Sequence, residues 1–93
     1  MTAKMRRVTE DVRANRTARL LVARLEAVAR VAGQLRHSET ERLVELASVA
    51  TMRAVALELI RAEQATEIWR EAHVRHPQLP QPARLELPHR LAA

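Results

Sequence analysis

LVELASVATMRAVALELI, residues 43–60, is the stretch around which the predicted fold is organised. It reads as the middle of one long helix whose polar residues are scattered around the helix axis instead of gathering on one side. A helix that is apolar nearly all round is normally buried, and a single neighbouring helix covers only part of such a surface. We therefore interpret this stretch as a surface through which copies of the chain, or other helices, associate.

The alternative interpretation is a rich single-sided core with a few exposed apolar residues, which is common in soluble proteins. Under the first interpretation, the larger apolar side chains of the stretch make the contacts. The predicted oligomer interface consists of Leu43, Val44, Val49, Met52, Val55, Leu57, Leu59 and Ile60.

The composition predicts an all-α protein. The chain has 93 residues, which is typical of one domain. It contains one glycine and one tryptophan, and it has neither phenylalanine nor tyrosine. Alanine, leucine, arginine, glutamate and valine dominate, and most of these residues favour helix. We find no run of alternating apolar and polar residues, bounded by turn residues, that would indicate a strand.

The composition also bears on the compartment. Cysteine is absent, which excludes disulfides, thiolate metal sites and thiol nucleophiles. The N-terminal sequence MTAKMRRVTE has no apolar segment after its basic residues, so we expect no signal peptide. No stretch approaches the ~18 apolar residues that a membrane-spanning helix needs. Fifteen arginines against one lysine indicate a GC-rich genome, and we expect a cytoplasmic bacterial protein that does not bind membranes.

The first predicted helix covers residues 10–36 and follows a basic N-terminal arm, residues 1–9. Thr9 is a suitable N-cap residue, and Glu10 and Asp11 lie where the helix dipole favours acids. An apolar seam with alternating spacings of three and four residues runs along the helix. The seam consists of Ala18, Leu21, Leu25, Val28, Ala32 and Leu35.

The second predicted helix covers residues 39–75, because Ser38-Glu39-Thr40-Glu41 matches a capping box. The short connection between the two helices predicts that they are antiparallel neighbours. After Ile60 the pattern changes to that of an ordinary amphipathic helix with Trp69 on its apolar stripe, and this change allows a kink near 61–64.

The C-terminal segment, residues 77–93, holds all four prolines and is predicted to be extended. Two interpretations are open: a disordered tail, or a strap that docks on its own helices or on a partner. The complete prediction is an antiparallel helical hairpin, residues 10–76, with a Pro-rich C-terminal strap. The hairpin is expected to complete a helical bundle as a homo-oligomer or as a subunit of a larger complex.

No motif predicts an enzyme, a metal site, a cofactor or a small-molecule substrate. His73 and His76 are spaced as two metal ligands on a helix can be, but the sequence fixes no third ligand. The glutamates Glu63, Glu67 and Glu71 lack the Glu-x-x-His pattern of di-iron bundles. A chain with one glycine cannot form a Gly-rich phosphate loop. We interpret these side chains as structural or solvated, and we expect no catalytic residues.

Charge is distributed unevenly along the chain. Residues 1–36 hold nine Lys or Arg against three acids, whereas residues 37–93 hold seven Arg against eight Glu. Arg16, Arg19 and Arg30 fall together on the polar face of the first helix, with Glu26 the only acid among them, and Arg13 and Arg24 flank this row. The predicted nucleic-acid contacts are Lys4, Arg6, Arg7, Arg13, Arg16, Arg19, Arg24 and Arg30.

Clustered basic charge on one helix face favours phosphate, and arginine favours bidentate phosphate contacts. Base-stacking aromatic residues and base-reading motifs are absent, so we expect backbone binding without strong base readout. The sequence therefore predicts a non-enzymatic helical subunit of a nucleic-acid-associated assembly that binds RNA or DNA.

The alternative function is an adaptor or inhibitor that docks on an acidic partner protein without nucleic acid. A third class, a helix lying on a membrane surface, is disfavoured because the apolar face of residues 10–36 has no Trp or Phe. Accessibility of the arginine row decides between the first two. An open row favours nucleic acid, and a row covered by glutamates of the second helix or by a partner chain favours the adaptor.

Overall fold

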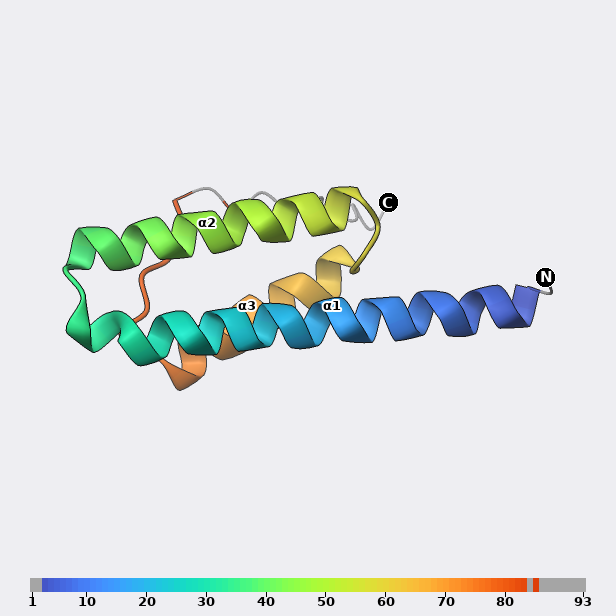
Figure 1. The fold of residues 1–93 in the computed structure, drawn as a ribbon, viewed down its shortest axis with the longest axis horizontal. Helices are drawn as coiled ribbons and strands as arrows, with labels where there is room; N and C mark the ends of the chain where they lie inside the picture. The colour runs from blue at the N-terminus through green and yellow to red at the C-terminus, as the bar shows by residue number, and fades with distance from the viewer. Residues whose placement is uncertain (1–2, 84, 86–93) are drawn as a thin grey trace.

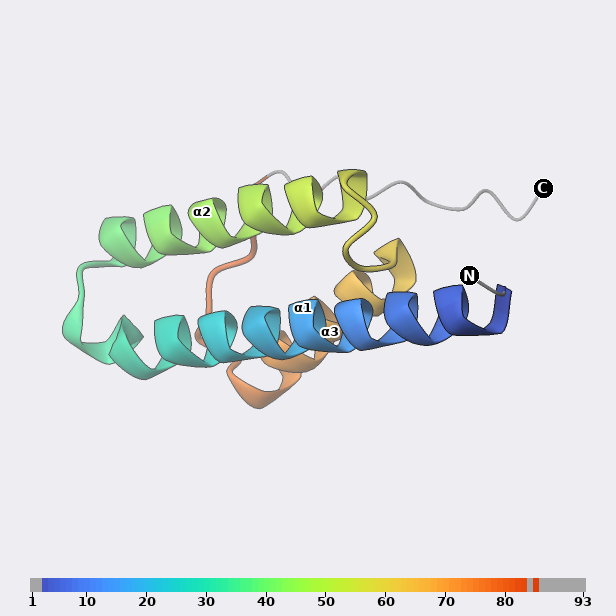
Figure 2. The ribbon, with the colours of Figure 1, turned by 45° about the vertical axis from the view of Figure 1, so that its right-hand side comes forward.

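The computed structural model describes residues 3–83 and 85, with side chains from Val12 onward. This part of the chain forms three α-helices and one 3-10 turn and contains no strand, which confirms the predicted all-α class. The elements are α1 (Ala3–Val31), η1 (Ala32–Gln34), α2 (His37–Ala56) and α3 (Ala62–Arg75). α1 and α2 run antiparallel side by side, and α3 returns along α1 from the α2–α3 loop (Figures 1 and 2).

The apolar seam positions α1. Leu21, Leu25 and Val28 are buried in the core that α1 shares with α2 and α3. The helix begins at Ala3, so the predicted basic arm outside the helix is wrong. It ends at Val31, where η1 replaces the last turn of the predicted helix. The helix boundaries therefore differ from the prediction, whereas the buried face is the predicted one.

α2 begins two residues earlier than the capping-box sequence predicts. Its N-cap residue is Arg36, and Ser38 lies inside the first turn. The Arg36 backbone N–H donates to Glu39 Oε1 at 3.1 Å, so Glu39 makes the backward hydrogen bond that the prediction assigned to Glu41. Glu41 instead lies 3.4 Å from His37 Nε2. The predicted short connection to a capped helix is present, but the residues that cap it are different.

The predicted continuous helix over residues 39–75 is wrong, because the chain turns between Ala56 and Ala62. Glu58 adopts the left-handed conformation with φ 58°. The backbone N–H of Leu59 donates to the Ala54 carbonyl at 2.9 Å, and that of Glu58 donates to the Val55 carbonyl at 3.0 Å. This pair of hydrogen bonds is a Schellman motif, which usually has glycine where Glu58 stands.

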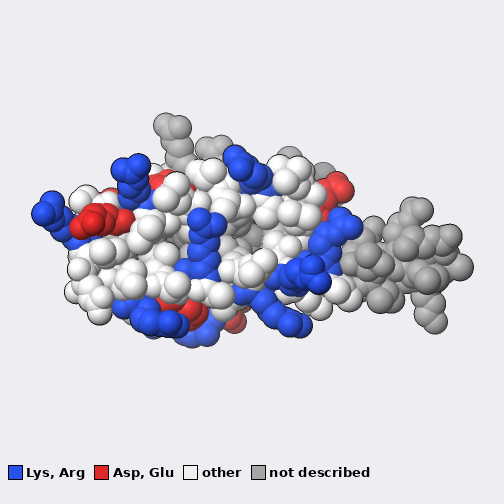
Figure 3. Space-filling model, viewed as in Figure 1, with Lys and Arg blue, Asp and Glu red and all other residues white. Residues whose placement is uncertain are grey.

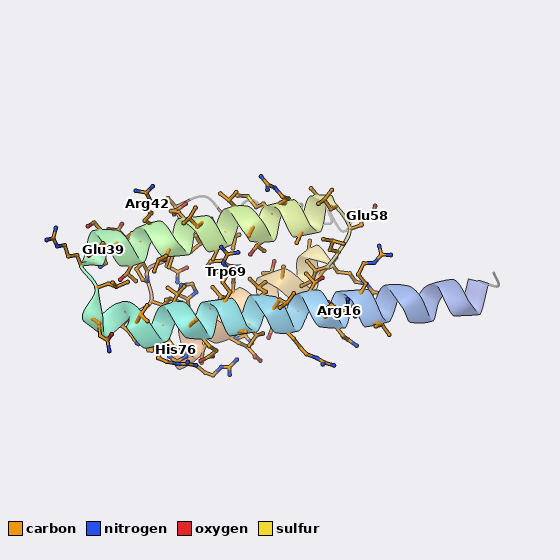
Figure 4. All side chains as sticks on the ribbon, viewed as in Figure 1. Arg16, Glu39, Arg42, Glu58, Trp69 and His76 are labelled. Carbon is orange, nitrogen blue, oxygen red and sulfur yellow. The ribbon has the colours of Figure 1, made fainter. Side chains whose placement is uncertain are left out.

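Burial of α3 explains a break at a place without glycine or proline. A continuous helix would carry Trp69 away from α1, whereas in the structure its side chain is only 3% exposed and lies between α1 and α2 (Figure 4). Burying an aromatic side chain removes ~150–250 Å² from water, which is worth about 4–6 kcal/mol at ~25 cal/mol per Å². A left-handed non-glycine residue costs about 1–2 kcal/mol. Burial therefore outweighs the local strain at Glu58.

One buried hydrogen-bond chain joins α2 to α3. Trp69 Nε1–H donates to Thr51 Oγ1 at 3.0 Å, and the Thr51 hydroxyl donates to the Ala47 carbonyl at 2.8 Å. Thr51 is as buried as the apolar residues around it. An indole N–H that is withdrawn from water needs an acceptor, and Thr51 supplies it. This polar contact fixes which face of α3 turns toward α2.

Residues 77–83 continue beyond α3 without helix. The side chain of Leu79 is 3% exposed and belongs to the hydrophobic core. His73 Nε2 lies 3.0 Å from the Pro80 carbonyl oxygen. The described part of this segment therefore packs on the helices, and the rest of the predicted strap, residues 84 and 86–93, lies outside the described residues.

Candidate nucleic-acid interface

Five of the arginines that are predicted to contact nucleic acid have described side chains: Arg13, Arg16, Arg19, Arg24 and Arg30. All five are exposed, and none forms an ion pair with any other residue that the structure describes. Figure 3 shows basic side chains along the visible length of α1. The other three predicted contacts, Lys4, Arg6 and Arg7, lie in the first turns of α1, and their side chains lie outside the described part.

Helical geometry divides the five arginines between two sides of α1. Arg16, Arg19 and Arg30 are separated by 3 and 11 residues, which places them on one side of a helix with 3.6 residues per turn. We call these three residues the arginine row. Arg24 instead lines a groove between α1 and α2, next to Leu20. The basic charge of α1 therefore serves two different surfaces.

Glu26, the one acid on α1 with a described side chain, is occupied by α3. Its Oε2 lies 2.9 Å from His76 Nε2, and its Oε1 lies 3.6 Å from a guanidinium nitrogen of Arg75. Such partly exposed pairs are worth only ~0–1 kcal/mol each to folding. Their effect on the charge of α1 is greater, because they compensate a carboxylate that lies between Arg24 and Arg30 in this helix.

The glutamates of α2 and α3 are engaged elsewhere. Five of them pair within their own helix, with the residue that caps it or with the C-terminal segment: Glu39–Arg36, Glu41–His37, Glu45–Ala83, Glu67–Arg70 and Glu71–Arg75. The hydrogen bond from Arg70, the largest effect, lowers the pKa of the exposed Glu67 carboxyl. None of these five glutamates reaches the arginine row, and no other residue that the structure describes forms an ion pair with it.

The residues predicted to form an oligomer interface are divided between the core and the surface. Val44 and Ile60 are buried in the core of this chain, so in this structure they do not form part of its surface. Leu43, Met52 and Val55 are partly buried against the same core.

The other three predicted interface residues lie nearer the surface. Leu59 is half-buried, whereas Val49 and Leu57 are exposed. Five large exposed apolar side chains are not among the predicted residues: Val12, Leu20, Val31, Leu46 and Val74. Leu20 was missed because the apolar positions beside it on α1 are interrupted by Arg24, which hides their regular spacing.

The paired histidines have structural contacts. His73 Nδ1 lies 3.0 Å from the Trp69 carbonyl oxygen, and its other ring nitrogen faces Pro80, while His76 contacts Glu26. Residues 3–83 and 85 contain no group of three or more His, Asp or Glu side chains arranged to hold a metal ion. Within the same residues, no helix is both long and apolar enough to cross a lipid bilayer.

Comparison of the chain with protein-family models, with curated proteins and with solved structures gives no match. Its function is therefore inferred from its own residues and their arrangement.

Proposed function

We propose that the protein is a non-enzymatic helical subunit of a nucleic-acid-associated assembly, and that the arginine row binds the phosphate backbone of RNA or DNA. One observation carries the proposal. Arg16, Arg19 and Arg30 are exposed without an ion-pair partner among the described residues, while Glu26 is occupied by α3.

The length of the row favours a polymer of phosphates over a single anion. Arg16 and Arg30 are 14 residues apart in one helix, which corresponds to about 21 Å at ~1.5 Å per residue. One phosphate cannot contact guanidinium groups spread over that distance, whereas a nucleic-acid backbone can. Arg13, three residues before Arg16 on the same helix, adds to the local positive potential.

The proposal predicts affinity that depends strongly on salt and weakly on sequence. Each neutralised phosphate contributes a slope of about −0.7 to −0.9 to log K against log salt. Three to five contacts therefore predict that binding weakens roughly 20- to 500-fold between ~50 and ~200 mM salt. Tight binding that is insensitive to salt would contradict this mode.

Fluorescence anisotropy with labelled single-stranded DNA, duplex DNA and duplex RNA tests the proposal. We expect the triple variant Arg16→Glu, Arg19→Glu, Arg30→Glu to lose binding to every probe that the wild type binds. The matched control is Arg36→Glu, Arg42→Glu, Arg53→Glu, which makes the same change in net charge on or next to α2. Because all six arginines are exposed, helicity and Trp69 emission should show that both variants fold.

Two outcomes would overturn the proposal. Wild-type protein that binds none of the probes at low salt would leave the acidic-protein adaptor as the function to test. Equal losses in the two triple variants would show that net charge, and not the arginine row, governs binding.

A further inference from the structure

A groove runs between α1 and α2 on a side that α3 does not cover. Its walls come from α1 (Leu20, Leu21 and Arg24) and from α2 (Ala50 and Ala54), and none of its lining residues comes from α3. The alanines keep its floor low, so that another helix can approach the two backbones closely. Figure 3 shows that uncharged atoms make up much of the surface between α1 and α2 on the face it presents.

Of the large exposed apolar side chains, Leu20 lines this groove, and helical spacing places Leu46 and Leu57 on the same side of α2 as its lining residue Ala50. Leu20 is 65% exposed, Leu46 is 51% exposed and Leu57 is 61% exposed. They belong to two rows with the alternating spacings of three and four residues by which helices pack in bundles. The α1 row is Thr17, Leu20, Arg24, Ala27 and Val31, and the α2 row is Leu43, Leu46, Ala50, Arg53 and Leu57.

The two rows are long enough to contact several turns of one bound helix. The α2 row spans 14 residues from Leu43 to Leu57, or about 21 Å, which is nearly four helical turns. Leu20 on the α1 side and Leu46 and Leu57 on the α2 side flank the small side chains Ala50 and Ala54, and such a groove can accept the apolar stripe of an amphipathic helix. Because α3 occupies the other side of the helix pair, a helix seated here would complete a four-helix bundle.

Charge specifies which helix fits. Arg24 and Arg53 lie near the middle of their rows, and none of the ten positions in the two rows carries an acid. Glu45 is the one acid of α2 within the span of its row; it lies about 100° around the helix from Leu46 and accepts a hydrogen bond from the Ala83 backbone N–H. A seated helix with Asp or Glu beside its apolar stripe would pair with both arginines, whereas a basic helix would be repelled.

The same charges argue against a second copy of this chain as the occupant. In a two-fold symmetric contact the same patch faces itself, so Arg24 and Arg53 would face the arginines of the other copy with no acid in either row. Nucleic acid also fits poorly, because the exposed leucines would lie against a charged backbone.

We propose that the groove between α1 and α2 binds a single amphipathic helix of a partner protein that carries acidic residues beside its apolar stripe. This inference goes beyond the proposed nucleic-acid function and is independent of it, because the arginine row does not line the groove. A chain that bound both ligands would link an acidic protein to RNA or DNA.

Two synthetic helical peptides test the inference with the full chain. Both carry leucine at spacings of three and four residues over about five helical turns. The acidic probe has glutamate flanking the leucines, and the basic probe has lysine at the same positions. By anisotropy we expect the acidic probe to bind roughly 2- to 30-fold more tightly, since two exposed charge pairs contribute ~0.2–1 kcal/mol each.

Charge reversal in the groove provides the specific control. Arg24→Glu, Arg53→Glu should invert the preference, so that the basic probe binds more tightly than the acidic one. Leu20→Ser, Leu46→Ser should weaken both probes. The row variant Arg16→Glu, Arg19→Glu, Arg30→Glu makes a larger change in net charge and should leave the order of the two probes unchanged.

Three results would overturn the inference: binding of neither probe by the folded wild type, an unchanged preference after charge reversal in the groove, or a wild-type dimer that Leu20→Ser, Leu46→Ser dissociates. The third would assign the groove to a second copy of the chain. Light scattering during size exclusion measures the oligomeric state. If neither peptide binds, the proposal that the arginine row binds phosphate is unaffected, so the two proposals can fail independently.

Discussion

At the residue scale, the contact that distinguishes this fold from a plain apolar bundle is the hydrogen bond from Trp69 to Thr51. Both residues are almost fully buried. Removing the acceptor leaves an indole N–H without a partner in the core, which costs about 1–3 kcal/mol. The cost arises from desolvation, so it does not depend on a loss of packed volume.

We therefore expect Thr51→Val, which preserves shape and removes the hydroxyl, to lower the free energy of unfolding by about 1–3 kcal/mol. Urea denaturation followed by Trp69 emission measures it. The matched control is Thr66→Val, because the exposed Thr66 hydroxyl donates only to the Ala62 carbonyl of its own helix. Thr51→Val as stable as the control would mean that the buried hydrogen bond contributes nothing to stability.

Glu58, in contrast to Thr51, lowers the stability of the fold locally, because its backbone conformation is unfavourable for a residue other than glycine. With φ 58°, it holds a position that glycine occupies with less strain. We expect Glu58→Gly to raise the free energy of unfolding by about 1 kcal/mol. Glu41→Gly, on an exposed turn inside α2, should instead destabilise by about 1 kcal/mol.

Thermal or urea unfolding of the two glycine variants gives the signs directly. If Glu58→Gly were destabilising, the side chain of Glu58 would have to make a contact that outweighs the strain at this position.

At the element scale, η1 offers a position where the opposite substitution should help. A Cβ added at Gly33 would meet no heavy atom within 4 Å, and Gly33 does not have a positive φ. Alanine reduces the conformational entropy of the unfolded chain, so Gly33→Ala should stabilise by about 0.4–1 kcal/mol. A rise in Tm is the expected result, and a fall would show that η1 needs the freedom of glycine.

The same elements show how far the sequence alone leads. The spacing of Leu21, Leu25 and Val28 is sufficient to predict the buried face of α1, because a regular helix converts spacing directly into position. The break before α3 is not predictable in this way. No glycine or proline marks Glu58, and the burial of Trp69 that stabilises the turn is a long-range effect.

The candidate site also combines features that local spacing predicts with features that depend on long-range contacts. Exposure of the arginine row follows from its place opposite the seam of α1, so the sequence predicts it. Val44 and Ile60 are buried in a core that also contains Trp69 and Ala72 of α3, and the sequence does not predict the turn that brings α3 back to this core. The pairing of Glu26 with His76 joins residues 50 positions apart, and no local pattern indicates it.

At the scale of the whole molecule, the segment after α3 is part of the core through Leu79. Leu79→Ala should destabilise by about 2–5 kcal/mol, the cost of a large buried truncation. The same substitution at the exposed Leu46 should change stability by less than ~0.5 kcal/mol. Urea unfolding compares the two, and equal effects would show that residues 77–83 do not contribute to the folded core.

The molecule presents two surfaces with different chemistry, the arginine row and the groove that contains Arg24. Under the two proposals, their separation on α1 would allow an acidic helix and a nucleic acid to bind at the same time. The proposed function depends on the first surface, and its sharpest signature is the number of phosphates neutralised.

The most direct test is the slope of log K against log salt for duplex DNA, measured for the wild type and for single Arg→Ala variants of the row. Each of Arg16→Ala, Arg19→Ala and Arg30→Ala should make the slope less negative by about 0.9, whereas Arg36→Ala should leave it unchanged. A slope near zero for the wild type, or equal slopes for all the variants, would contradict phosphate binding by this face of α1.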